Sequence, residues 1–144
     1  MSRRRWSAAL AAVAVVSLAA PAGAAPQLRR HSYFATPSRN IGCVLVDGTA
    51  RCDIRRRTWS PPPRPRSCPP EVDYGQGIVV ATAGRAMFVC AGDTALIPRA
   101  PILDYGRIDL YDGFYCSSER GGVTCRSAHS GHGFAISRTA YRLF

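Results

Sequence analysis

A chain of 144 residues has room for one domain of the commonest size and is too short for several. It carries 19 basic residues, every one of them an arginine, against 9 acidic residues, for a formal charge of +10. Guanidinium groups stay charged and form paired hydrogen bonds with carboxylates and phosphates, so the composition favours anionic partners over cationic ones.

The first 25 residues have the layout of a secretory signal peptide. An arginine-rich start precedes an apolar run at residues 8–20, and residues 22–24 (Ala-Gly-Ala) have the small-x-small form that signal peptidase cleaves. The run is shorter than the roughly 20 residues that span a bilayer as a helix. We therefore predict a cleaved leader at 1–25, no membrane anchor, and a secreted or extracytoplasmic domain at 26–144. The choice between the general and the twin-arginine export routes stays open.

A tight hairpin is predicted around Asp47-Gly48. An Asp-Gly pair favours a type I′ turn, because both central residues of that turn need positive φ. Counting outward from the turn places Cys43 opposite Cys52 in a non-hydrogen-bonded pair, where the Cα atoms lie about 4.5 Å apart. That separation falls within the range that a disulfide spans.

Residues 55–77 form the one long irregular stretch, with six prolines, five arginines and a tryptophan. Proline cannot donate a ladder hydrogen bond, so we expect this segment to run extended over the surface. Arginine binds phosphate or carboxylate, and an indole can stack on a sugar or a peptide. The alternative is a solvated arginine face with the tryptophan covering one end of the core. The candidate ligand-binding residues are Arg55, Arg56, Arg57, Trp59, Arg64 and Arg66.

A second hairpin repeats the cysteine spacing of the first. Cys116 and Cys125 flank Arg120-Gly121, and a two-residue turn or a slightly wider loop would place them opposite each other. An even number of cysteines in an exported chain predicts disulfides. Neither a CxxC spacing nor a zinc-type Cys/His cluster is present, so we predict no metal site. The predicted disulfides are Cys43–Cys52, Cys68–Cys90 and Cys116–Cys125.

The remaining pattern predicts strands. Short runs rich in Val, Ile, Tyr, Phe and Thr alternate with Gly, Pro and Asp turn signals, and helical periodicity is absent apart from one turn that Ser137 could cap. We predict an all-β fold with little helix, either a small antiparallel sandwich or a partly open barrel, held by three disulfides. The predicted strands are 31–36, 41–46, 49–54, 77–83, 85–90, 107–111, 113–117, 122–127 and 133–137.

Several short motifs follow one another between Phe34 and Phe144: TPSxNIxC, RCDI, PPPRP, FVCAGDT, GVTC and GHGFxIS. Together they resemble a family of small secreted actinobacterial proteins of unknown function. The resemblance implies export and a disulfide-bonded domain, and it implies no activity and no catalytic residues. It also leads us to expect glycine at the position of Arg39.

Signals for catalysis are weak. His129 and His132 have a spacing that suits a metal, but they lie in a Gly/Ser-rich turn and lack a third ligand nearby. There is no GxSxG motif. The only glutamates, Glu71 and Glu119, lie in different loops, which argues against a glycosidase carboxylate pair. We predict no enzymatic activity and no cofactor, with a small extracytoplasmic enzyme using His129 and His132 as an alternative.

The basic segment carries the leading functional hypothesis. We predict that residues 55–66 bind an anionic envelope polymer or lipid, or a secreted protein, in a non-enzymatic role. Specific nucleic-acid binding is not expected of an exported protein. The alternative hypothesis is a secreted inhibitor of a hydrolase, because a rigid disulfide-braced loop loses little entropy when it docks.

Overall fold

The computed structural model describes residues 28–30 and 32–144, so the predicted leader at 1–25 lies outside the described residues. No helix occurs in the described part of the chain. The strands there are β1 (Leu28–Arg29), β2 (Tyr33–Ala35), β3 (Ile41–Val46), β4 (Thr49–Ile54), β5 (Tyr74–Ala81), β6 (Met87–Cys90), β7 (Arg107–Tyr111), β8 (Phe114–Glu119), β9 (Gly122–Ser127), β10 (Gly133–Ile136) and β11 (Tyr141–Leu143).

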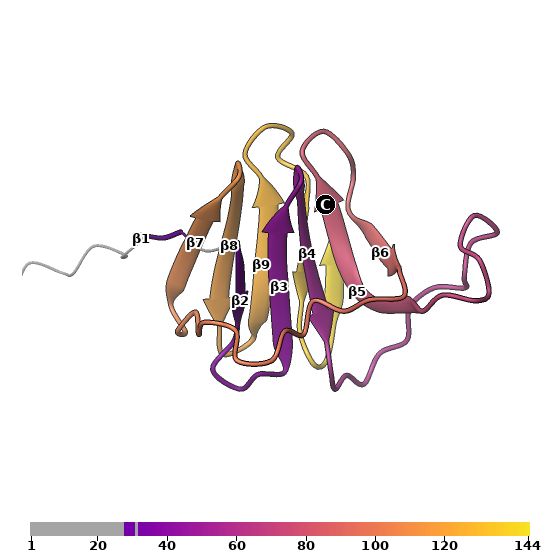
Figure 1. Ribbon diagram of the computed structural model, residues 1–144, viewed down its shortest axis with the longest axis horizontal. Helices are drawn as coiled ribbons and strands as arrows, with labels where there is room; N and C mark the ends of the chain where they lie inside the picture. The colour runs from indigo at the N-terminus through magenta and orange to yellow at the C-terminus, as the bar shows by residue number, and fades with distance from the viewer. Residues whose placement is uncertain (1–27, 31) are drawn as a thin grey trace, which may run out of the picture.

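The strands form two sheets that pack face to face (Figure 1). One sheet is antiparallel with the order β2-β3-β4-β5-β6. The other has the order β1-β7-β8-β9-β10-β11 and is antiparallel apart from the short β1, which runs parallel to β7. With β1 excepted, the first half of the chain makes one sheet and the second half makes the other. The predicted antiparallel sandwich is confirmed, and the described strands do not close into a barrel.

Turn geometry sets the positions of the cysteines, as the sequence predicts. Asp47 and Gly48 both have positive φ, 52° and 68°, and the β3–β4 register pairs Cys43 with Cys52 at a Cα–Cα distance of 4.1 Å. The β8–β9 hairpin repeats this arrangement. All three predicted disulfides are confirmed: Cys43–Cys52, Cys68–Cys90 and Cys116–Cys125.

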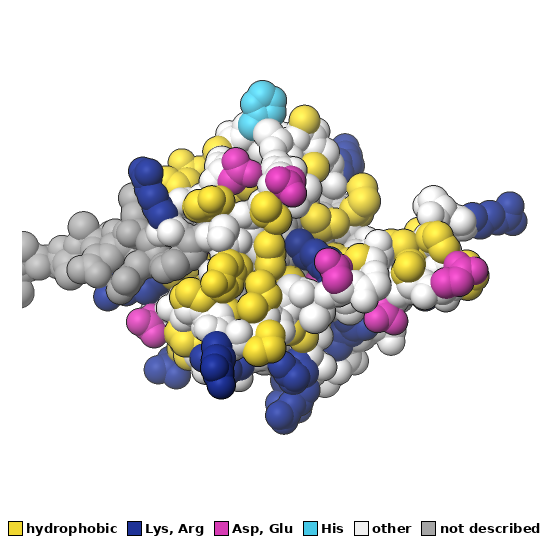
Figure 2. All heavy atoms as spheres, viewed as in Figure 1, with side chains coloured by type: hydrophobic (Ala, Val, Ile, Leu, Met, Phe, Trp, Pro, Cys, Tyr) yellow, Lys and Arg dark blue, Asp and Glu magenta, His cyan; other side chains and the backbone are white. Residues whose placement is uncertain are grey.

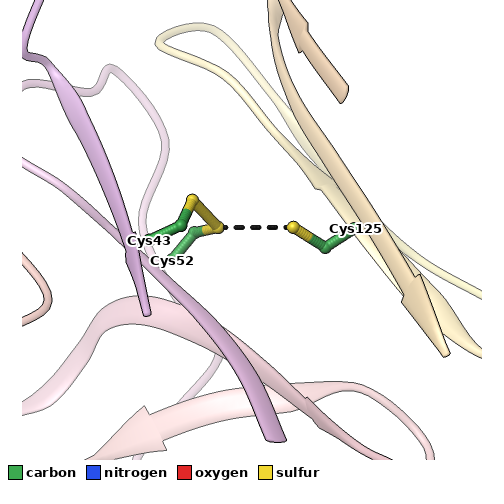
Figure 3. A group of neighbouring side chains, drawn as sticks. All are labelled: Cys43, Cys52 and Cys125. Carbon is green, nitrogen blue, oxygen red and sulfur yellow. Dashed lines mark hydrogen bonds between the residues drawn. A yellow bond between two sulfur atoms is a disulfide. The ribbon is translucent and has the colours of Figure 1, made fainter. Parts of the chain in front are cut away.

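The two hairpin disulfides meet in the core, one from each sheet. Figure 3 shows the Cys43–Cys52 disulfide facing Cys125 of the other sheet. The Sγ atoms of Cys52 and Cys125 lie 3.6 Å apart. Both sulfurs are oxidised and carry no hydrogen, so this is a van der Waals contact and not a hydrogen bond. The same core cluster contains three fully buried phenylalanines, Phe34, Phe114 and Phe134. Each of these two disulfides joins neighbouring strands of one sheet, so packing alone holds the two sheets together at this point.

The short turn predicted at Ser137 is present but is not helical: the Ser137 Oγ accepts from the Ala140 N–H, and the Ser137 N–H donates to the Ala140 carbonyl, which leads the chain into β11. One local prediction is wrong. Residues 74–77 are not irregular, because β5 begins at Tyr74, which pairs with Cys90. The prolines end at residue 70, so nothing prevents the chain from joining the sheet at that point.

A buried carboxylate attaches the segment after β6 to β4. Asp53 is fully buried and accepts hydrogen bonds from Arg51 Nε (2.9 Å), Arg51 Nη2 (2.8 Å), Thr94 Oγ1 (3.1 Å) and the Ala95 N–H (2.9 Å). Arg51 Nη1 also donates to Asp93 at 2.6 Å. Burial alone would lower the pKa of Arg51, but its hydrogen bonds to Asp53 and Asp93 outweigh burial and raise that pKa. The network holds residues 91–95 against the sheet.

Candidate anion-binding site

Trp59 is part of the structural framework. Its indole Nε1 donates to the Ser137 carbonyl at 2.8 Å. Its ring makes edge contacts with Phe88 and Tyr141, at centroid distances of 6.1 and 4.8 Å. The half-buried indole thus covers one end of the core and binds the β10–β11 turn, which matches the alternative role considered for it from the sequence.

Two of the predicted arginines are also engaged internally. The Arg57 guanidinium lies 4.5 Å from the centroid of the Trp59 ring and donates to the Gly75 carbonyl. Desolvation by burial lowers the pKa of Arg57, although a guanidinium remains charged at neutral pH. Arg64 donates to two carbonyls of its own loop and lies over the Tyr74 ring. These side chains brace the Pro/Arg-rich segment.

The other three predicted arginines are exposed: Arg55, Arg56 and Arg66. Within the described chain, none of their guanidinium groups forms an ion pair or a side-chain hydrogen bond. Arg66 lies on the connection between β4 and β5, which reaches out beyond the sandwich (Figure 1). Arg55 and Arg56 directly follow β4 and line a groove that the sequence alone does not reveal.

The groove has a volume of about 810 Å³ and is surrounded by arginines. Five guanidinium-bearing residues line it, together with one tyrosine and the polar residues of a turn, and no acidic residue is among the lining. The five arginines and the tyrosine are Arg39, Arg55, Arg56, Arg120, Arg138 and Tyr105. A hollow of this size falls within the range of small-molecule sites, roughly 300 to 1,000 Å³.

The groove lies at one end of the sandwich because several connections converge there. The β2–β3, β8–β9 and β10–β11 turns lie at that end, at the bottom of the view in Figure 1. Arg55 and Arg56, which follow β4, lie at the same end. Figure 2 shows basic side chains gathered along the same lower edge, and since the chain has no lysine they are all arginines. Antiparallel hairpins of two packed sheets place their turns at common ends, so residues far apart in sequence meet.

Hydrogen bonds fix the backbone beneath the arginines. The Asn40 side chain accepts from the Arg56 N–H (2.9 Å) and donates to the Arg56 carbonyl (3.0 Å). The Asn40 carbonyl accepts from the Arg55 N–H at 2.8 Å. On the other side, the Thr58 N–H donates to the Arg138 carbonyl at 2.8 Å. The groove therefore has a pre-organised backbone, while its guanidinium groups remain free for a ligand.

The positive charge of the groove arginines is not neutralised by ion pairs with described acidic residues. Among the described residues the ion pairs belong to Arg51, and no groove arginine takes part in one. Arg120 lies over the Tyr105 ring at 5.4 Å, a contact that leaves its donors available. The nearest acidic residues in sequence, Asp104 and Glu119, adjoin groove residues but do not line the groove. The result is a concave surface of one charge sign, which attracts anions.

Sequence reasoning missed three of the five arginines, Arg39, Arg120 and Arg138, and also Tyr105. Each lies in a separate turn, and these turns come together only through strand pairing and the packing of the two sheets. Arg39 has φ 54°, in the left-handed region that glycine favours, which agrees with the glycine expected there from the family resemblance.

Two other groups of side chains carry atoms of the kind that bind metals or take part in catalysis: the two histidines and the sulfurs in the core. His129 is exposed and His132 half-buried in the β9–β10 turn, at the opposite end of the sandwich from the groove. The Sγ atoms of Cys43, Cys52 and Cys125 all lie within 4.8 Å of one another (Figure 3). Each of these sulfurs is already bonded in a disulfide.

The fold and the groove define a small disulfide-bonded β-sandwich with an arginine-lined hollow at one end. The chain belongs to a family of unknown function, DUF6636, which matches residues 11–144. No curated protein and no solved structure matches it. Within the described residues, no helix is long and apolar enough to cross a membrane. The secreted and actinobacterial character suggested by the sequence motifs stays a prediction.

Proposed function

We propose that this protein is a non-enzymatic, extracytoplasmic binding domain that holds an anionic component of the cell envelope in its arginine-lined groove. The observation that carries the proposal is the set of five arginines that line one hollow without an acidic residue in its lining. Three disulfides suit an oxidising compartment outside the cytoplasm. There the abundant anions belong to lipids and acidic wall polymers.

The first test replaces two groove arginines. Arg55→Ser/Arg56→Ser is expected to weaken binding of the oxidised protein to isolated envelope by roughly tenfold or more, because the loss of even one charged hydrogen bond costs about 1.5 kcal/mol. Binding by the unmodified protein should also fall steeply with added salt, because exposed charges are screened. The measurement is co-sedimentation with envelope over a salt series.

The matched control is Arg85→Ser/Arg126→Ser, which removes the same charge from exposed arginines that do not line the groove. It should bind nearly as well as the unmodified protein. A further variant, Arg39→Gly, removes a groove charge at a position whose φ of 54° suits glycine, so it should weaken binding without loss of stability. Equal losses in the groove and control variants would reject the groove as the site.

The extended connection between β4 and β5 favours a second candidate, a secreted hydrolase inhibitor. This connection projects from the sandwich (Figure 1) and is braced by Cys68–Cys90 and by the hydrogen bonds of Arg64. A rigid projecting loop suits insertion into an enzyme cleft. The test incubates the oxidised protein with a panel of secreted proteases and glycosidases. Inhibition that Arg66→Ser relieves is the expected result, and no inhibition across the panel eliminates this candidate.

A further inference from the structure

A second hollow, of about 320 Å³, adjoins the basic groove and shares part of its lining. Arg39, Ile41 and Arg55 line both hollows, so the two adjoin at these residues. The second hollow has an apolar part, formed by Ala35, Ile41, Leu96, Ile97 and Pro98, and its lining also includes Gly42 and three arginines, Arg39, Arg55 and Arg99. A ligand that fills both hollows has a charged part and a hydrocarbon part.

We propose that the ligand of the groove is an anionic lipid, with its phosphate among the groove arginines and part of one acyl chain in the apolar hollow. This inference rests on the proposed function, and it names the chemical class of the ligand. Arg39 and Arg55 stand at the boundary between the two hollows, where the phosphate of such a lipid joins its glycerol and acyl parts. Guanidinium groups suit phosphate because they donate paired hydrogen bonds.

The apolar hollow distinguishes a lipid from a water-soluble polyanion. A hydrophilic polymer would be held by the arginines and would leave the surfaces of Leu96 and Ile97 in water. An acyl chain would cover them, and each buried methylene raises affinity by about fourfold. Figure 2 shows hydrophobic and arginine side chains next to each other on the lower part of this face, as an amphiphile requires.

A third hollow, of about 290 Å³, is a weaker place for the chain. It touches the groove at Gly121 and Gly122, and its lining includes Glu119. The carboxylate of Glu119 would repel a phosphate placed at that junction, whereas the lining of the Ile97 hollow carries arginines and no acid. The acyl chain is therefore assigned to the hollow formed by the segment after β6.

The test compares three soluble probes by titration calorimetry on the oxidised full chain: dihexanoyl-phosphatidylglycerol, glycerol phosphate and dihexanoyl-phosphatidylcholine. The anionic lipid should bind about tenfold or more tightly than glycerol phosphate, because a few methylenes enter the hollow. It should also bind more tightly than the phosphatidylcholine, which carries no net charge.

One matched pair of variants separates the two hollows. Ile97→Ser should lower the affinity for the anionic lipid severalfold and leave glycerol phosphate binding unchanged. Ile102→Ser is the control, since its side chain has the same exposed fraction, 36%, but does not line the hollow. Arg55→Ser/Arg56→Ser should weaken both anionic probes.

The outcomes also separate this inference from the proposed function. Equal affinity for the anionic lipid and glycerol phosphate, or no effect of Ile97→Ser, overturns the lipid assignment and leaves arginine-dependent envelope binding in place. Envelope binding that is indifferent to Arg55 and Arg56 overturns both. A lipid preference that is lost in Ile97→Ser and kept in Ile102→Ser supports the proposed class of ligand.

Discussion

The Asp53→Asn variant is expected to lose about 3 kcal/mol or more of its free energy of unfolding. Asp53 is fully buried and accepts hydrogen bonds from Arg51, Thr94 and Ala95. An amide in its place removes the charge that compensates the half-buried guanidinium, and its N–H₂ group faces donors and not acceptors. Urea denaturation monitored by tryptophan fluorescence measures the loss.

The control is the same Asp→Asn substitution at the second carboxylate that binds the Arg51 guanidinium. Asp93 also pairs with Arg51, but its side chain is 82% exposed, so Asp93→Asn should cost less than about 1 kcal/mol. The hydrogen bond to Arg51 lowers the pKa of Asp93, so its contribution is present at neutral pH and is lost as pH falls through that lowered pKa. The small difference between Asp93→Asn and the unmodified protein should therefore vanish in acid. Similar costs for the two variants at neutral pH would show that burial of Asp53 is not the decisive factor.

Removing the two hairpin disulfides should give effects that are large and not additive. Replacing both cysteines of Cys43–Cys52 or of Cys116–Cys125 by alanine should each lower the free energy of unfolding by about 2 to 3 kcal/mol. The contact of 3.6 Å between Cys52 and Cys125 couples the pairs, so the combined loss should differ from the sum by about 0.5 kcal/mol or more. Denaturant titration of the oxidised variants completes the cycle.

Cys68–Cys90 provides the comparison, because neither of its cysteines belongs to the core cluster. Its removal together with Cys43–Cys52 should be additive within experimental error. If the stability losses from removing the two hairpin disulfides were also additive, the sulfur contact between the sheets would carry no measurable energy.

The disulfides and hairpins could be predicted because they depend on local geometry. The Asp47-Gly48 turn sets the register of β3 and β4, and the register alone places Cys43 beside Cys52. The short β11 could not be predicted in this way. Its three residues have no strand pattern of their own and depend on pairing with β10, and the sequence predicts only the Ser137 turn that precedes them.

The candidate site was only partly predictable for a related reason. Arg55 and Arg56 stand out in the sequence as a charged run, but Arg120 and Arg138 are isolated residues in separate hairpin turns. Their convergence with Arg55 and Arg56 requires the packing of two sheets. Likewise, no sequence pattern shows that Trp59 donates its N–H to the Ser137 carbonyl and packs on the core instead of facing solvent.

The division of the chain between the sheets affects how the molecule responds to proteolysis. Strands β2–β6 with two disulfides come before residues 91–106, and β7–β11 with the third come after them. A single cut within 91–106 would leave no covalent bond between the two pieces, even with every cysteine oxidised. The nicked protein would then be two chains held together only by noncovalent contacts, namely the shared core and hydrogen bonds such as that from Trp59 to the Ser137 carbonyl.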